Sequence, residues 1–233
     1  MVEKRYLEPT AMIQSDHPAV VELVKELTAG ITDSVTKAVK LFYFVRDGIW
    51  YDPYYPFHRP EFYQASRILA DRKGYCVSKA VVLCALARAA GIPARLAFAD
   101  VKNHLATRQL LEHMGSDRFV YHGYNQFRLE GRWVSAAATF NRQLCARHRV
   151  DPLDFDGRHD AVLQPYNRHK QQFMEYLCYH GTFSDVPLDR ILAAWKEAYG
   201  KERVARWIEW HRQAEGGSIR NFLRKDPEIG SSR

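Results

Sequence analysis

Residues 72–95 read RKGYCVSKAVVLCALARAAGIPAR, and Cys76 stands directly before a run that is almost wholly apolar as far as residue 90. A helix that is apolar on every side lies in a protein interior. Gly91 and Pro93 end this helix, because glycine is common just past a helix C-terminus and proline cannot continue the hydrogen-bond ladder. The stretch therefore predicts a buried central helix with Cys76 at its first turn.

The position of Cys76 favours a reactive thiol. The free N–H groups and the positive end of the helix dipole stabilise an anion, which lowers a thiol pKa from its free value of about 8.5. The same N–H groups offer a site for an oxyanion. The alternative is that Cys76 is a small buried apolar side chain, because free cysteine is among the most buried residue types.

The other three cysteines predict neither a metal site nor a disulfide. Cys84 falls in the middle of the apolar run and is expected in the core. Cys145 and Cys178 each lie near a histidine, but their spacing lacks the paired CxxC pattern of structural zinc sites. We expect no metal and no cofactor, and the scattered cysteines favour a reducing compartment, the cytoplasm.

Composition indicates a globular protein with one domain over residues 1–233, which has 46% hydrophobic residues. The net charge is +7, but the basic residues are interleaved with 27 acidic ones. This pattern predicts a solvated surface and no nucleic-acid partner. No apolar span is long enough to cross a bilayer, so no membrane partner is expected.

Periodicity and turn residues predict the remaining elements. Asp33 and Ser34 are capping candidates for the second of two amphipathic helices. Glu130 and Gly131 separate two strand-like runs and predict a hairpin. Helices are expected at 16–29, 34–47 and 61–71, within the polar stretch 102–117, at 171–180 and, as one or two helices, at 187–214; strands at 94–101, 118–129 and 132–140; an aromatic loop at 50–60; and an extended connection at 151–170.

His122 is the histidine best placed to work with Cys76. It lies on the first predicted hairpin strand among aromatic residues, where burial can tune its pKa. His58 and His104 fall in or beside predicted loops. Four more stand in strongly charged surroundings: His148, His159, His169 and His211. A cysteine and a histidine are the minimum pair for nucleophilic catalysis of this kind.

These features together resemble the transglutaminase-like superfamily, whose core is papain-like. The resemblance covers about residues 35–145 and is carried by GIPARLAFADVKNHL, YHGYNQF and WVSAAATFN. It is similar in particular to bacterial transglutaminase-like proteins. It implies an α+β fold in which the cysteine-bearing helix packs on an antiparallel sheet, with added N- and C-terminal helices, a C-terminal cap at about 171–214 and a mobile tail from about 216.

The resemblance implies that Cys76 is the nucleophile and His122 the general base and acid. In the better known pattern an aspartate stands four residues after the strand tryptophan, where this chain has Ala137. Asn141 shares strand parity with Ala137 and is a candidate to orient His122, as asparagine does in papain-like sites. It would lie about 13 Å further along a straight strand. Thr139 is the rival, and Asn141 is otherwise a turn residue that ends the strand.

The implied activity is cysteine-dependent acyl transfer on an amide or peptide bond of a peptide or protein, through a thioester. Water as the second nucleophile gives hydrolysis, and an amine gives transamidation. The aromatic loop at 50–60 could line the cleft. The alternative is a transglutaminase-like binding module with weakened or lost catalysis, because Ala137 cannot accept a hydrogen bond from an imidazole.

Overall fold

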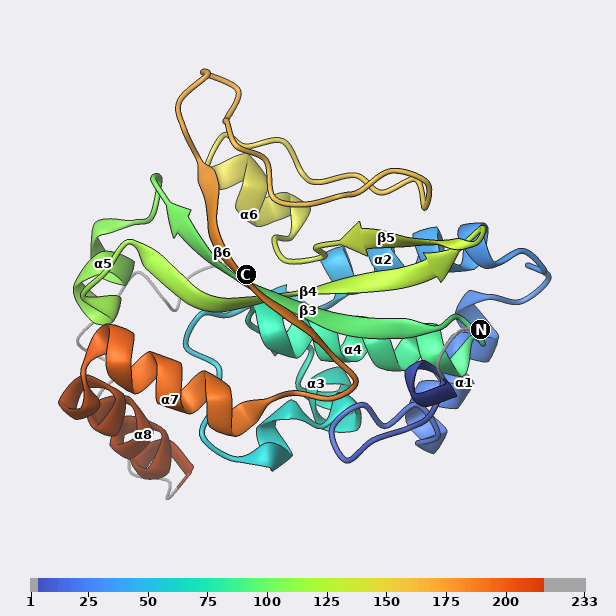
Figure 1. Cartoon of the computed structure of the whole chain (residues 1–233), viewed down its shortest axis with the longest axis horizontal. Coiled ribbons are helices and arrows are strands. Elements are labelled where there is room, and N and C mark those ends of the chain that lie inside the picture. Colours follow the sequence, from blue (N-terminus) through green and yellow to red (C-terminus); the bar gives the residue numbers. More distant parts are fainter. Residues whose placement is uncertain (1–3, 216–233) are drawn as a thin grey trace.

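A four-stranded antiparallel sheet packed on one central helix forms the middle of the computed structural model, which describes residues 4–215 (Figure 1). The strand order is β5-β4-β3-β6, and a short parallel pair, β1-β2, lies apart from this sheet. The helices are η1 (Lys4–Tyr6), α1 (Pro18–Leu27), α2 (Ser34–Gly48), η2 (Pro60–Tyr63), α3 (Ala65–Asp71), α4 (Cys76–Ala89), α5 (Arg108–Met114), α6 (Arg142–Arg147), α7 (Leu188–Tyr199) and α8 (Lys201–Glu215). The strands are β1 (Trp50–Tyr51), β2 (Lys73–Gly74), β3 (Ala94–Asn103), β4 (Arg118–Leu129), β5 (Arg132–Ala136) and β6 (Met174–Phe183).

Helix α4 is the predicted buried helix. Every residue from Val77 to Arg88 is buried, because α1, α2, α3 and the sheet all pack around it. Its two cationic side chains are buried with their charges paired to carbonyl oxygens. Lys79 binds the end of α2, and Arg88 donates to Ala94 O, Glu8 O and Ser184 O. The prediction of a central interior helix is confirmed.

The hairpin is also confirmed, with strands β4 and β5 paired from Asn125 and Ala136 to the turn. Glu130 and Gly131 both have positive φ, 45° and 81°, which suits the two-residue turn of a hairpin. The second strand is shorter than predicted. It ends at Ala136, and the chain then leaves the sheet so that residues 137–140 form no strand.

Four further predictions agree with the structure. Helix α1 falls within the predicted segment 16–29, α2 runs one residue past the predicted 34–47, and Asp33 caps α2 by accepting a hydrogen bond from Thr36 N at 2.8 Å. Strand β3 begins where predicted. Residues 151–170 form a connection without a named helix or strand, and α7 and α8 divide the predicted C-terminal helical region.

The prediction of a short helix at 171–180 is wrong. Residues Met174–Phe183 form strand β6, which pairs antiparallel with β3 from Leu96 to Asn103. A strand forms here because the segment is rich in aromatic residues and because the open edge of β3 supplies its hydrogen bonds. The local sequence does not reveal this pairing partner.

Different segments of the chain pack on the two faces of the sheet. Phe98 and Tyr121 belong to the large core that includes α4, whereas Ala99 and Tyr124 pack against residues of the 150–174 segment. Helices α7 and α8 lie together at one end of the molecule, with α7 against β4 (Figure 1). Among the described residues no helix is long and apolar enough to span a membrane. The predicted tail from residue 216 lies outside the described residues.

Candidate active site

Cys76 begins α4 and is the partly buried cysteine that opens onto a cavity of about 210 Å³. The residue before it, Tyr75, places no side-chain cap on the helix, so the N–H groups of the first turn remain free of a capping oxygen. The backbone N–H groups of Gly123, Val77 and Cys76 itself act to lower the pKa of the thiol. Burial has the larger, opposite effect and raises the pKa of Cys76 to about 11.

This result corrects the expectation of a thiolate formed by the helix end alone. The dipole and the N–H groups act in the predicted direction, but the loss of hydration costs more than they contribute. The neutral thiol is therefore the resting form of Cys76 at neutral pH.

His122 lines the same cavity as Cys76, from strand β4. The next residue, Gly123, explains how the strand comes so close to the helix. A Cβ at position 123 would lie 3.1 Å from Val77 Cα, so only glycine lets β4 approach the first turn of α4 without displacement. Cys76 and His122 were expected to lie together. They line one cavity, and the residues that follow them, Val77 and Gly123, are in close backbone contact.

The surroundings of His122 are aromatic and apolar. Its ring lies 6.3 Å from the rings of both Tyr124 and Tyr176, and only 3% of the residue is exposed. Its Nε2 has no hydrogen-bond partner among the described residues. Burial lowers the pKa of His122 to about 4, so the imidazole is neutral at pH 7. Ala137 is also buried, in the same apolar cluster as Tyr124, and provides no acceptor.

Asn141 does not orient His122. Its Nδ2 donates to Arg46 O at 2.6 Å and to Ile49 O at 2.9 Å, and its Oδ1 accepts from Tyr51 N at 2.6 Å. Asn141 therefore joins the C-terminal end of α2 to the start of the aromatic loop. The prediction that Asn141 is a catalytic residue is therefore corrected. Both ends of its amide are hydrogen-bonded to backbone atoms of residues 46–51. Thr139, the rival, lines the cavity.

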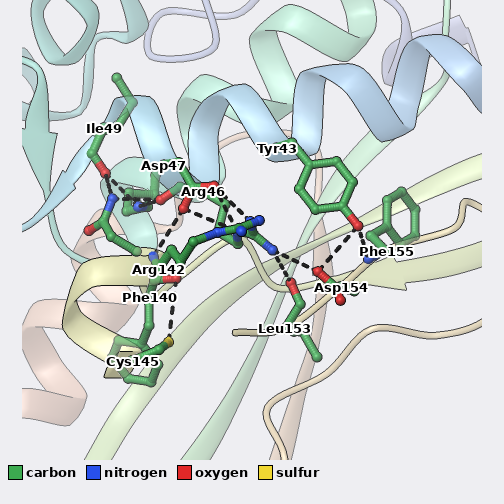
Figure 2. Close-up of polar contacts among 12 residues, drawn as sticks. Tyr43, Arg46, Asp47, Ile49, Phe140, Arg142, Cys145, Leu153, Asp154 and Phe155 are labelled. Atoms are coloured by element: carbon green, nitrogen blue, oxygen red, sulfur yellow. Dashed lines mark hydrogen bonds and ion pairs between the residues drawn. The ribbon is translucent and has the colours of Figure 1, made fainter. Parts of the chain in front are cut away.

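Lys79 binds the same two carbonyl oxygens as Asn141. Its Nζ lies 2.9 Å from Arg46 O and 2.5 Å from Ile49 O, and burial lowers its pKa to about 7. The side chain of Arg46 extends the network to Asp47, Leu153 O and Asp154 (Figure 2). We name this group, Arg46, Asp47, Lys79, Asn141 and Asp154, the α2-end cluster.

A β-bulge in strand β4 precedes His122. Ala99 pairs with His122 and Val101 with Phe119, so Val120 and Tyr121 together stand opposite Asp100. Tyr121 has a φ of 58°, in the left-handed region that favours glycine. Such a bulge turns the following side chains and is common beside active sites.

Side chains from three elements hold this bulge. Asp100 accepts hydrogen bonds from Tyr121 N at 3.0 Å and from His180 Nε2 at 2.6 Å, and the His180 ring stacks on Tyr121 with centroids 4.1 Å apart. From α7, Tyr199 Oη accepts from Val120 N, and Trp195 Nε1 donates to Val120 O. The sequence pattern alone predicts no role for Asp100 or His180. The motif FADV contains Asp100, but only the fold brings His180 next to it.

The aromatic loop contributes in part as predicted. Tyr51, Pro53 and Tyr54 line the cavity, whereas Tyr55 and Phe57 are in the core and Trp50 is exposed. Cys145 and His148 line the cavity too, while Cys178 is exposed on β6. Within residues 4–215 no group of three or more histidine, cysteine, aspartate or glutamate side chains could hold a metal ion.

Two solved structures resemble the chain at low identity. A candidate cysteine protease from Cytophaga hutchinsonii is 17% identical, with a TM-score of 0.46, over 76% of this chain and 53% of its own. A candidate protease from Parabacteroides distasonis ATCC 8503 is 14% identical, with a TM-score of 0.38, over 55% of this chain and 26% of its own. The chain thus spans about half of the first protein and about a quarter of the second.

A search of the curated proteins finds no match. The family model of the transglutaminase-like superfamily matches residues 21–138, just over half of the chain, from α1 to the residues after β5. The matched segment contains both Cys76 and His122. The chain therefore belongs to the transglutaminase-like superfamily.

Proposed function

We propose that the protein is a cysteine-dependent acyl-transfer enzyme that acts on an amide or peptide bond through a thioester. The observation that carries the proposal is the shared cavity of Cys76 and His122, at the first turn of the buried helix α4. A purely structural cysteine needs neither an opening to a cavity nor a histidine beside it.

The shifted pKa values support a reaction that begins from two neutral side chains. Cys76 rests as a thiol and His122 as a neutral imidazole at neutral pH. His122 therefore acts as general base: it takes the thiol proton while the sulfur attacks the carbonyl carbon. N–H groups at the first turn of α4 stabilise the oxyanion, aided by the positive end of the helix dipole.

Collapse of the tetrahedral intermediate completes the first half of the reaction. The carbon–nitrogen bond breaks, and the imidazolium of His122 returns its proton to the leaving amine. An acyl group then remains on Cys76 as a thioester. In the second half water or an amine attacks the thioester, His122 accepts the proton of that nucleophile, and Cys76 recovers its own.

A second candidate function is a binding module with weakened catalysis. The specific observation in its favour is the unpartnered Nε2 of His122, and this chain has Ala137 at the sequence position of the acceptor in the better known pattern. Without an acceptor the imidazolium that forms during the reaction is less stable, so this protein would react slowly or only bind its ligand.

Acylation by p-nitrophenyl acetate tests the proposal. Release of p-nitrophenol gives the rate, and peptide mass spectrometry locates the acetyl group, with exposed Cys178 as an internal reference thiol. Cys76 should be acylated faster than Cys178 at pH about 7, and His122→Gln should slow Cys76 at least tenfold without affecting Cys178. Equal rates at both cysteines, or no effect of His122→Gln, would favour the binding module.

A further inference from the structure

The cavity beside Cys76 and His122 is bounded by several separate segments of the chain, among them the aromatic loop at 50–60 and strand β4. The end of β3 and the start of α5 form one wall, residues 139–150 form a second, and Phe173 and Met174 contribute from the start of β6. Cys76 and His122 occupy part of its lining. A group attached to the attacked carbonyl therefore has this space within reach.

The lining is apolar in character. Apolar side chains supply most of it: Val101, Leu105, Ala106, Leu110, Phe119, Phe140, Leu144, Val150, Phe173 and Met174. None of the described lining residues is aspartate, glutamate, lysine or arginine, although these types make up 26% of the chain. A charged group that entered would lose its water and find no opposite charge, whereas an apolar group would gain by leaving water.

The size of the cavity limits what fits. An apolar cavity of about 150 Å³ holds a benzene molecule. The 210 Å³ beside Cys76 therefore has room for one aromatic ring or a branched or short linear aliphatic group. The polar lining residues Thr107 and Gln109 are exposed, which places the mouth of the cavity near the start of α5.

We infer that the cavity binds the acyl portion of the substrate, and that this portion is uncharged and apolar. The inference rests on the proposed function and narrows its substrate to amides of hydrophobic carboxylic acids, including peptides with an apolar residue on the carbonyl side of the attacked bond. The acyl group enters the cavity, and its carbonyl carbon lies at the sulfur of Cys76.

A series of p-nitrophenyl esters tests this inference, because every member loses the same p-nitrophenolate as the sulfur–carbon bond forms. Acetyl, butyryl, hexanoyl and anionic hemisuccinyl esters are compared by single-turnover release of p-nitrophenol. The rate at Cys76 is divided by that at exposed Cys178, which corrects for the intrinsic reactivity of each ester. Each added methylene should raise the ratio about fourfold until the cavity is full, and the hemisuccinyl ester should fall at least tenfold below the butyryl ester.

A variant that fills the cavity sharpens the test. Ala106→Phe should lower the ratio of hexanoyl to acetyl transfer at least tenfold, because the ring takes the space of the longer chain. Ala146→Phe, at an exposed position of α6 outside the lining, should keep the ratio of the parent protein. Circular dichroism confirms that both variants fold.

The outcomes separate this inference from the proposed function. Acylation of Cys76 that depends on His122 but not on the acyl group would overturn the apolar substrate class and leave acyl transfer standing. A preference for the hemisuccinyl ester would also overturn it. If no ester acylates Cys76, the proposed function fails, and the inference fails with it.

Discussion

Two buried polar regions lie near the first half of α4 and differ in how their groups are bonded. In the α2-end cluster, Asn141 and Lys79 satisfy the carbonyl oxygens of Arg46 and Ile49. At the cavity, His122 is buried to the same degree, yet its Nε2 has no partner among the described residues.

The difference separates stability from chemistry. A buried group whose hydrogen bonds are all made stabilises the fold, and removing it leaves its partners unpaired. A buried imidazole without a partner destabilises the fold, and such a cost is common where a group must exchange protons with a substrate. Asn141 therefore has a structural role, and the unpartnered imidazole of His122 supports the catalytic role proposed for it.

The largest expected effect concerns Asn141. Asn141→Ala should lower the free energy of unfolding by about 3 to 4 kcal/mol, because it leaves Tyr51 N unpaired and removes two bonds to buried carbonyl oxygens. Urea unfolding measures the change. Thr139→Val, a control of nearly equal size that removes one hydroxyl from the cavity wall, should cost about 1 kcal/mol or less. An unchanged stability in Asn141→Ala would break the comparison.

The second prediction concerns the acid stability of His122. Its pKa is about 4 in the folded protein and about 6.5 in the unfolded chain, so only the unfolded chain binds the proton between these values. Stability is therefore complete above pH about 6.5 and is lost as the pH falls toward 4, by about 3 kcal/mol. Glutamine cannot take up this proton. Between the same pH values His122→Gln should therefore lose about 3 kcal/mol less of its free energy of unfolding than the parent protein, as measured by urea unfolding. Parallel acid losses would show that His122 is not buried as a neutral base.

The third prediction concerns the bulge before His122. Asp100→Ala should cost about 2 kcal/mol, because Tyr121 N and His180 lose their acceptor. It should also slow acylation of Cys76 and alter its pH profile, since β4 no longer holds His122 in place. Asp100→Asn keeps an acceptor for Tyr121 N and should recover most of the stability. If the pH profile of acylation stays the same in Asp100→Ala, Asp100 supports the fold alone.

The smallest expected effect comes from restoring the acceptor. Ala137→Asp should raise the pKa of His122 by about one unit, equivalent to about 1.4 kcal/mol, because a carboxylate favours the imidazolium. The pH dependence of Cys76 acylation reports the shift, and the rate near neutral pH should rise. Ala138→Asp serves as the neighbouring control. The same pH profile of acylation for both variants would show that a carboxylate at position 137 does not interact with His122.

Several elements were predictable because their signal is local. The run from Val77 to Ala89 has no polar face, so it could only be an interior helix, and Glu130-Gly131 suits a tight hairpin turn. The pairing of Cys76 with His122 followed from a resemblance in motif order. Strand β6 was missed because its local pattern is ambiguous and its pairing partner, β3, lies some 80 residues earlier.

The sequence by itself determined the buried helix, the cysteine at its head and the strand that carries the histidine. These depend on side-chain type and short-range periodicity. Only the tertiary structure decided that burial outweighs the helix dipole at Cys76, that Asn141 bonds to the end of α2, and that Asp100 and His180 hold the bulge. Solvation and hydrogen bonding depend on which distant segments surround a group, and the order of residues along the chain does not specify those neighbours.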